Sequence, residues 1–247
     1  MKNRLLIVSA VCTFALVAAG CRHRATANAT ATPPTAPAKE EAKAAPAKAT
    51  AEKKPAAYEV IGSIERLDPR LDQLIPTNAV LEKLAEGFVW TEGPVWLKEG
   101  SLLLFSDVPK NTIYQWTEAE GVKAFLRPSG YTGSARREGE PGSNGLTIDN
   151  QGRLVVCQHG DRRIARVKSD GRFTTLVQYY QFRRLNSPND LVFKSNDDLY
   201  FTDPPYGLPK LNEDPNKEIP FNGVYRVKPN GEVTLLTDEL TFPNGIA

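Results

Sequence analysis

The chain has 247 residues, of which 31 are Lys or Arg and 29 are Asp or Glu, for a net charge of +2. Residues 1–57 hold nine of the basic and three of the acidic side chains, so residues 58–247 carry a net charge of −4. Since this larger part has no basic stripe, we expect no nucleic-acid partner.

The first 21 residues have the pattern of a bacterial lipoprotein signal peptide. Lys2 and Arg4 precede an apolar run that is too short to span a bilayer comfortably, and small residues then lead to Cys21. Lipidation of Cys21 would anchor the mature chain to a membrane, whereas the alternative is an ordinary cleaved signal. The residue after Cys21 is Arg22, so the Asp of a retention signal is absent from this position. We therefore expect an extracytoplasmic, lipid-anchored protein on the periplasmic face of the outer membrane or on the cell surface.

The next two segments precede the repeated part of the chain. Residues 22–57 are mainly Ala, Pro, Lys, Thr and Glu, so we expect a disordered tether. Residues 58–79 have no clean period and predict an arm or short helix that packs on the first unit of the fold. Cys157 is the only cysteine after Cys21, which excludes an intramolecular disulfide in the mature chain and favours a small buried side chain.

A repeated pattern organises residues 80–247. A polar residue precedes an apolar strand, a tight turn and a second strand with a polar end, at residues 92–107, 144–159 and 189–203. Each copy continues into two further strands joined at Glu-Gly, Asp-Gly or Asn-Gly, and Asp-Gly and Asn-Gly are strong hairpin signals. A fourth copy begins at residues 242–247.

Four-strand units that repeat about every 50 residues are typical of propeller blades. The alternative is a β-sandwich, which gives no reason for the repeated polar residue. We therefore predict an all-β fold of propeller blades. The chain holds about three and a third of them, whereas closed propellers have about 4–8. We accordingly expect residues 80–247 to be part of a propeller that is truncated in its fourth blade.

One polar residue stands just before the first strand of each unit. We call these four residues the hook residues: Glu92, Asn144, Asn189 and Asn244. The first strands of propeller blades line the central channel, so these side chains are expected to converge at its mouth. One carboxylate and several amide oxygens suit Ca²⁺ or another hard divalent cation, whereas Zn²⁺ would require His or Cys. The alternative is that Asn-Gly and Pro-Asn only form turns. Agreement among four positions favours the metal site.

Four motifs resemble the SMP-30/gluconolactonase/LRE family: residues 91–96, 187–193, 200–207 and 242–245. The resemblance runs from about residue 80 to the end of the chain. It implies a six-bladed β-propeller, a central divalent metal that is usually Ca²⁺, and hydrolysis of lactones or related esters.

The same resemblance assigns roles to individual residues. Glu92 and Asn244 match metal ligands of the family, and Asn189 matches a position that binds metal or substrate. The remaining ligand of the family is an Asp on a later blade, which is expected beyond Ala247. Asn144, Asn189 and Asp190 are the candidate substrate-binding residues, and a structural role is the alternative for Asp190.

The second strands end at equivalent positions, which are Asp107, His159 and Asp203. In paraoxonase-like relatives a His at a similar strand end is a candidate base, and a neutral imidazole near pH 7 suits that task. We therefore name His159 as a candidate catalytic residue, with a hydrogen bond to a neighbouring loop as the alternative. Asp203 is the second candidate catalytic residue and could orient a ligand amide; the alternative is a strand-end cap.

One position departs from the family pattern. Several sugar-lactone hydrolases of this family carry Arg two residues before the hook Asn, where this chain has Ser187, although Arg183 and Arg184 lie nearby. This departure leaves the nature of the lactone open. The loops 127–142 and 208–221 are expected to overhang the channel mouth and to shape specificity.

The sequence thus supports two functions of different classes. The first is a Ca²⁺-dependent hydrolase that opens a small-molecule lactone or related ester, with a carboxylate or His159 activating water. The second is a non-catalytic, surface-tethered propeller that binds a sugar or a protein partner and uses the ion only to stiffen its channel.

Overall fold

A computed structural model describes residues 58–247. The predicted signal peptide, the lipidated Cys21 and the tether lie outside the described residues, so the membrane anchor and the cellular location stay predictions. Within residues 58–247, no helix is long and apolar enough to cross a membrane.

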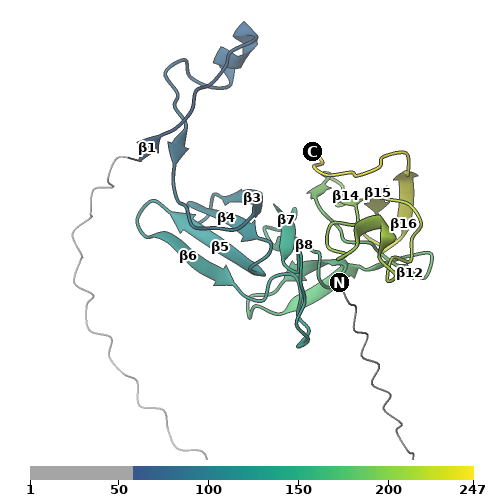
Figure 1. The fold of residues 1–247 in the computed structure, drawn as a ribbon. Helices are drawn as coiled ribbons and strands as arrows, with labels where there is room; N and C mark the ends of the chain where they lie inside the picture. Colours follow the sequence, from purple (N-terminus) through teal and green to yellow (C-terminus); the bar gives the residue numbers. More distant parts are fainter. Residues whose placement is uncertain (1–57) are drawn as a thin grey trace, which may run out of the picture. The chain divides into compact units, whose positions relative to one another are not determined.

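Most of the strand residues form three antiparallel sheets, each of four strands that follow one another in sequence order (Figure 1). The first sheet contains β3 (Thr91–Leu97), β4 (Leu102–Asp107), β5 (Thr112–Thr117) and β6 (Gly121–Leu126). The second contains β7 (Ser143–Ile148), β8 (Leu154–Gln158), β9 (Arg163–Val167) and β10 (Phe173–Val177). The third contains β13 (Leu191–Phe193), β14 (Leu199–Asp203), β15 (Gly223–Val227) and β16 (Val233–Thr237). The predicted all-β fold and its four-strand units are confirmed.

The outer hairpin of each sheet turns at a glycine. Gly121, Gly171 and Gly231 have φ values of 66°, 77° and 87°, a left-handed backbone that glycine adopts without steric cost. The strands on either side pair antiparallel as β5–β6, β9–β10 and β15–β16. The turn signals in the sequence therefore mark the outer hairpins correctly.

The second sheet is buried on both faces. Strand β8 is buried along its whole length, and its alternate side chains point to opposite faces. On one face, Leu154 and Val156 form a cluster with Leu104 and Ile113 of the first sheet. This packing explains why β8 is a continuous apolar run rather than an alternating one.

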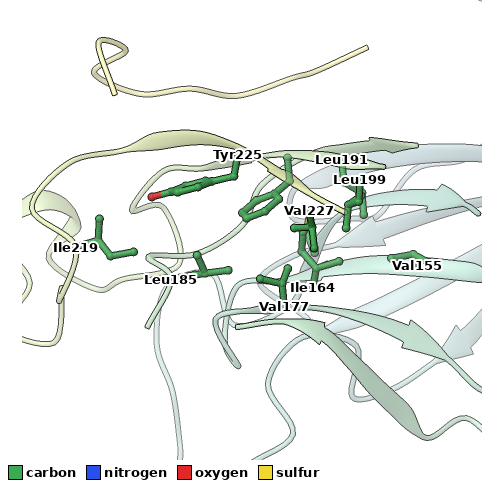
Figure 2. Close-up of a cluster of buried hydrophobic side chains, with 11 residues drawn as sticks. Val155, Ile164, Val177, Leu185, Leu191, Leu199, Ile219, Tyr225 and Val227 are labelled. Atoms are coloured by element: carbon green, nitrogen blue, oxygen red, sulfur yellow. The ribbon is translucent and has the colours of Figure 1, made fainter. Parts of the chain in front are cut away.

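The other face of the second sheet packs against the third sheet. Figure 2 shows Val155, Ile164 and Val177 in one cluster with Leu199 and Val227. The innermost strands also meet, because β7 contacts both β3 and β13. The three sheets therefore stack face to face with their first strands together, which is the arrangement of neighbouring propeller blades.

The arm agrees with its prediction only in part: it contains a short helix, and Tyr58 at its start contacts Trp116 of β5. Strand β1 (Glu59–Val60) pairs with β2 (Glu82–Lys83), and the short 3₁₀ helix η1 (Pro69–Gln73) lies between them. Leu67 is 85% and Leu74 81% exposed, so the middle of the arm does not pack on the first sheet as expected. Figure 1 shows this segment extending away from the sheets.

Two further segments lie outside the three sheets: one links the second sheet to the third, and the other is inserted into the third. The hairpin of β11 (Tyr179–Tyr180) and β12 (Arg183–Arg184) precedes β13. The insertion between β14 and β15 contains the short 3₁₀ helix η2 (Leu211–Glu213).

Candidate metal centre

The four hook residues line one cavity of about 200 Å³, together with Trp90, Glu140 and Tyr206. We call this cavity the hook pocket. Its lining comes from three blades and from the segment that follows β16, so residues far apart in the sequence meet there. The structure thus brings together the four positions that the repeat singled out.

Hydroxyl groups of one blade hold the hook of the next. Ser106 Oγ donates a hydrogen bond to the main-chain carbonyl of Asn144 at 2.9 Å, and Thr202 Oγ1 donates to that of Asn244 at 2.6 Å. Ser106 and Thr202 occupy the same position, one residue before the strand-end acid. These bonds use the main-chain carbonyls and leave the side-chain amides to line the pocket.

Two glycines allow the hooks to approach one another closely. Gly145 N donates to the carbonyl of Asn189 at 2.7 Å, and a Cβ at Gly145 would lie only 2.6 Å from that oxygen. A Cβ at Gly93 would lie 2.3 Å from the carbonyl oxygen of Asn144. Strands β3 and β7 both shift register at this point, as β-bulges that re-aim side chains do. Glycine after the hook residues Glu92 and Asn144 is therefore required by packing between blades.

The strand-end acids fix the loops that enter the hooks. Asp203 accepts hydrogen bonds from the main-chain N–H groups of Asn186 and Ser187 at 2.7 and 2.9 Å. Asp107 accepts hydrogen bonds from the N–H groups three and two positions before Glu92, at 3.1 and 3.4 Å. The donors stand three and two positions before the hook residue in both blades. The repeated acid is thus a repeated structural cap.

The environment of Asp203 agrees with this role. Its side chain is completely buried, and it does not belong to the lining of the hook pocket. Burial raises the pKa of Asp203 to about 7, opposed by the N–H donors of Asn186 and Ser187 and by the charge of Arg162. The structure fits the strand-end cap that was the alternative at this position, and it gives the predicted catalytic role no geometric support.

A pH series tests the burial of this carboxyl group. An unfolded Asp ionises near 3.8, whereas folded Asp203 retains its proton up to about 7. The folded state therefore binds more protons in this window, and its stability decreases as the pH rises from about 4 to about 7. We expect Asp203→Asn to remove this part of the decrease in urea unfolding measured at several pH values. A variant with an unchanged slope would assign the effect to another group.

His159 holds the equivalent strand end in the second blade. An Asp there would find one donor fewer, because Pro141 stands three positions before Asn144 and has no N–H. The His159 ring is completely buried, with Nδ1 3.2 Å from Glu140 Oε2. Within residues 58–247, neither ring nitrogen makes a well-aligned hydrogen bond. His159 therefore departs from the structural repeat and reaches the hook pocket through Glu140.

Asp190 does not line the hook pocket either. Its carboxylate accepts hydrogen bonds from the main-chain N–H groups of Leu191 at 2.9 Å and Ile246 at 3.0 Å. The second bond secures the chain just after Asn244. This geometry fits the structural alternative for Asp190, and its predicted contact with substrate stays a prediction.

Three pocket residues were not among the candidates from the sequence. Trp90 and Tyr206 adjoin or belong to the motifs at 91–96 and 200–207, which could have indicated them. Glu140 lies in the loop before β7 and follows no repeat, so no local signal marks it.

The carboxylate and amide oxygens that line the hook pocket are suitable ligands for a hard divalent cation. Trp90 Nε1 donates to Glu92 Oε1 at 2.8 Å and orients this carboxylate at the pocket wall. In the described part of the chain, no cluster of three or more His, Cys, Asp or Glu side chains could hold a metal. An ion in this pocket would therefore depend on the amide oxygens of the hooks as well, and Ca²⁺ accepts carboxylate and amide oxygens together.

Face-to-face four-stranded sheets whose first strands converge on an oxygen-lined pocket define part of a β-propeller with a central ligand site. Residues 90–247 match the family described as SMP-30/Gluconolactonase/LRE-like region, and the chain belongs to this family. The resemblance read from the motifs is confirmed.

The chain is also similar to individual gluconolactonases. It is 43% identical over 190 residues to a gluconolactonase of Zymomonas mobilis, across 76% of this chain and 53% of that protein. A crystal structure provisionally assigned as a gluconolactonase is 31% identical, with a TM-score of 0.62, over 72% of this chain and 59% of that one. A gluconolactonase from Xanthomonas campestris is 33% identical, with a TM-score of 0.56, over 66% and 52%. The chain thus spans roughly half of each relative.

Proposed function

We propose that this chain is part of a divalent-metal-dependent hydrolase that opens a lactone or a related ester. The observation that carries the proposal is the convergence of one hook carboxylate and three hook amides on a single pocket. The 43% identity to a gluconolactonase supports the same chemistry. The proposal includes both that the ion is Ca²⁺ and that the substrate is a lactone.

Each hook residue has a defined task in this proposal. Glu92, Asn189 and Asn244 would hold the cation, and Asn144 would contact the substrate beside them. A divalent cation at this position supplies a Lewis acid that polarises a carbonyl group and stabilises the charge that develops on its oxygen. Trp90 and Tyr206 line the same pocket and give the substrate apolar surface.

Besides the hook residue Glu92, the pocket is lined by a second carboxylate, that of Glu140. We assign Glu140 the role of general base, which accepts the proton from the attacking water, because a carboxylate at the pocket wall can act in this way. His159 Nδ1 lies 3.2 Å from Glu140 Oε2 and positions this carboxylate from behind. In this proposal His159 has a positioning role rather than the direct contact with water that the sequence suggested.

Metal removal tests the function. The full-length protein is expected to hydrolyse glucono-δ-lactone and to lose at least about 100-fold in kcat/KM after chelation, because the ion supplies several kcal/mol to the transition state. Addition of Ca²⁺ is expected to restore the rate, measured by acid release in a pH-indicator assay. Activity that survives chelation would contradict the mechanism. Calcium binding without hydrolysis of any lactone or ester would favour the non-catalytic propeller.

A further inference from the structure

A second cavity lies among the loops of the second and third blades. Its volume is about 350 Å³, and four arginines line it: Arg136, Arg137, Arg162 and Arg184. We call it the arginine pocket. Tyr131, Leu208, Pro209 and Asn216 complete its lining. Residues 58–247 as a whole carry a net charge of −4. Four like charges around one small cavity repel one another and therefore need a compensating partner.

Main-chain carbonyls hold the arginines in place. Arg162 Nε donates to Leu185 O at 2.7 Å, and Arg162 Nη1 donates to Asn216 O at 2.8 Å. Arg137 Nη1 donates to Gly160 O at 2.6 Å. Carbonyl oxygens orient a guanidinium group but do not neutralise its charge, unlike a carboxylate.

The nearby carboxylates compensate this charge only in part. Glu218 lies 3.8 Å from Arg162 Nη1, and its side chain is 41% exposed. Asp161 is already paired with Arg163 at 2.9 Å. Asp214 accepts hydrogen bonds from N–H groups of its own loop. No carboxylate of the described residues thus forms a close ion pair inside the pocket.

The electrostatics of the arginines show the same imbalance. Burial lowers the pKa of Arg162, and the charge of Arg184 lowers it further. Burial likewise lowers the pKa of Arg137, and within residues 58–247 the buried Arg137 Nε has no hydrogen-bond partner. Arg remains charged in proteins. An anion in the cavity would therefore relieve both the repulsion and the lack of acceptors.

Direct contacts connect the arginine pocket to the hook pocket. Glu140 of the hook pocket lies 3.2 Å from His159 Nδ1. The His159 ring packs against Gly207, where a Cβ would come within 2.6 Å of the His159 Cβ. Arg137 Nη2 donates to Gly207 O at 2.8 Å. A continuous chain of contacts thus runs from Glu140 in the hook pocket through His159 and Gly207 to Arg137 in the arginine pocket.

We propose that the arginine pocket binds a carboxylate or phosphate group of the substrate, so that the preferred substrate is an acid-substituted lactone or ester rather than a neutral sugar lactone. Planar guanidinium groups match the geometry of both anions. The volume lies within the range of small-molecule sites, about 300–1,000 Å³. This assignment of the substrate class rests on the proposed hydrolase function.

Binding of inorganic phosphate tests the pocket without reference to catalysis. The variant carries Arg136→Gln and Arg184→Gln; Arg136 is exposed and Arg184 half-buried, so neither change opens the core. The control is Arg183→Gln, because Arg183 is exposed, adjoins Arg184 in β12 and does not line the pocket. Calorimetry of the full-length, metal-free protein is expected to show phosphate affinity that falls at least about tenfold in the double variant and not in the control. Equal affinity in all three proteins would overturn the site.

A comparison of lactones tests the link to the substrate. We expect the wild-type protein to have at least about tenfold higher kcat/KM for the 6-phosphate or 6-carboxylate of glucono-δ-lactone than for the neutral lactone. The double variant is expected to lose this ratio, and Arg183→Gln is expected to keep it. Phosphate binding with no preference for an acidic lactone would retain an anion site and overturn its assignment to the substrate. Phosphate binding without any hydrolase activity would show that the proposed function fails independently of the pocket.

Discussion

The variant Glu92→Gln is expected to lower the affinity for Ca²⁺ by at least about 100-fold, which is the largest single effect that the hook pocket predicts. Glu92 is the only carboxylate among the four hook residues, and an amide cannot replace its charge toward a divalent cation. If the ion polarises the substrate, kcat/KM for lactone hydrolysis is expected to fall by at least about 1,000-fold. Calorimetry and a lactone assay on the full-length protein measure the two quantities.

The substitution is designed to leave the fold intact. Glu92 Oε1 accepts a hydrogen bond from Trp90 Nε1, and the amide oxygen of Gln can accept the same bond. We therefore expect a change in unfolding free energy within about 1 kcal/mol. Glu99→Gln is the matched control, because Glu99 is exposed in the turn after β3 and carries the same chemical change. Calcium affinity that is equal in both variants and in the wild type would show that the hooks form only turns.

The repeat made the blades predictable. Each outer hairpin has a Gly at a left-handed turn position, and β8 has the continuous apolar run that burial on both faces requires. The hairpin of β11 and β12 was missed because its turn residues Gln181 and Phe182 both have positive φ without being Gly or Asn. Such a turn carries no local signal. The exposed middle of the arm was equally unpredictable, because Leu67 and Leu74 are apolar residues that are nevertheless exposed.

The site was predictable where it follows the repeat. The hook residues share one position in each blade, and the blade geometry alone brings them together. Glu140 belongs to a loop, and its place beside His159 depends on how that loop packs. The four lining arginines come from two separate loops and β12. Only the folded chain shows that they share one cavity.

The two loops predicted to overhang the channel mouth both line a cavity, and the first of them lines two. The loop 127–142 supplies Glu140 to the hook pocket and Arg137 to the arginine pocket. The loop 208–221 supplies Leu208 to the arginine pocket, and Tyr206, just before this loop, lines the hook pocket. In the proposed function, the blades would therefore position the metal ligands, whereas these loops would carry the residues that contact the rest of the substrate. Specificity can change in such loops without disturbing the hooks.

Close packing between the hooks predicts the second large effect, on stability. Gly93 has a φ of 56°, and a Cβ there would lie 2.3 Å from the carbonyl oxygen of Asn144. The added methyl group must push the first and second blades apart, so we expect Gly93→Ala to lower the unfolding free energy by about 3 kcal/mol or more. Urea unfolding of the full-length protein measures the change.

Gly152→Ala separates this clash from the cost of a left-handed backbone. Gly152 has a φ of 77°, but nothing lies within 4 Å of a Cβ at that position. The control is therefore expected to lose only about 1 kcal/mol. Because the clash at Gly93 falls on the hook residue Asn144 itself, Gly93→Ala is also expected to weaken Ca²⁺ binding, whereas Gly152→Ala is not. Equal losses of stability at the two glycines, with Ca²⁺ affinity preserved in both, would contradict the view that contact between blades sets the geometry of the hook pocket.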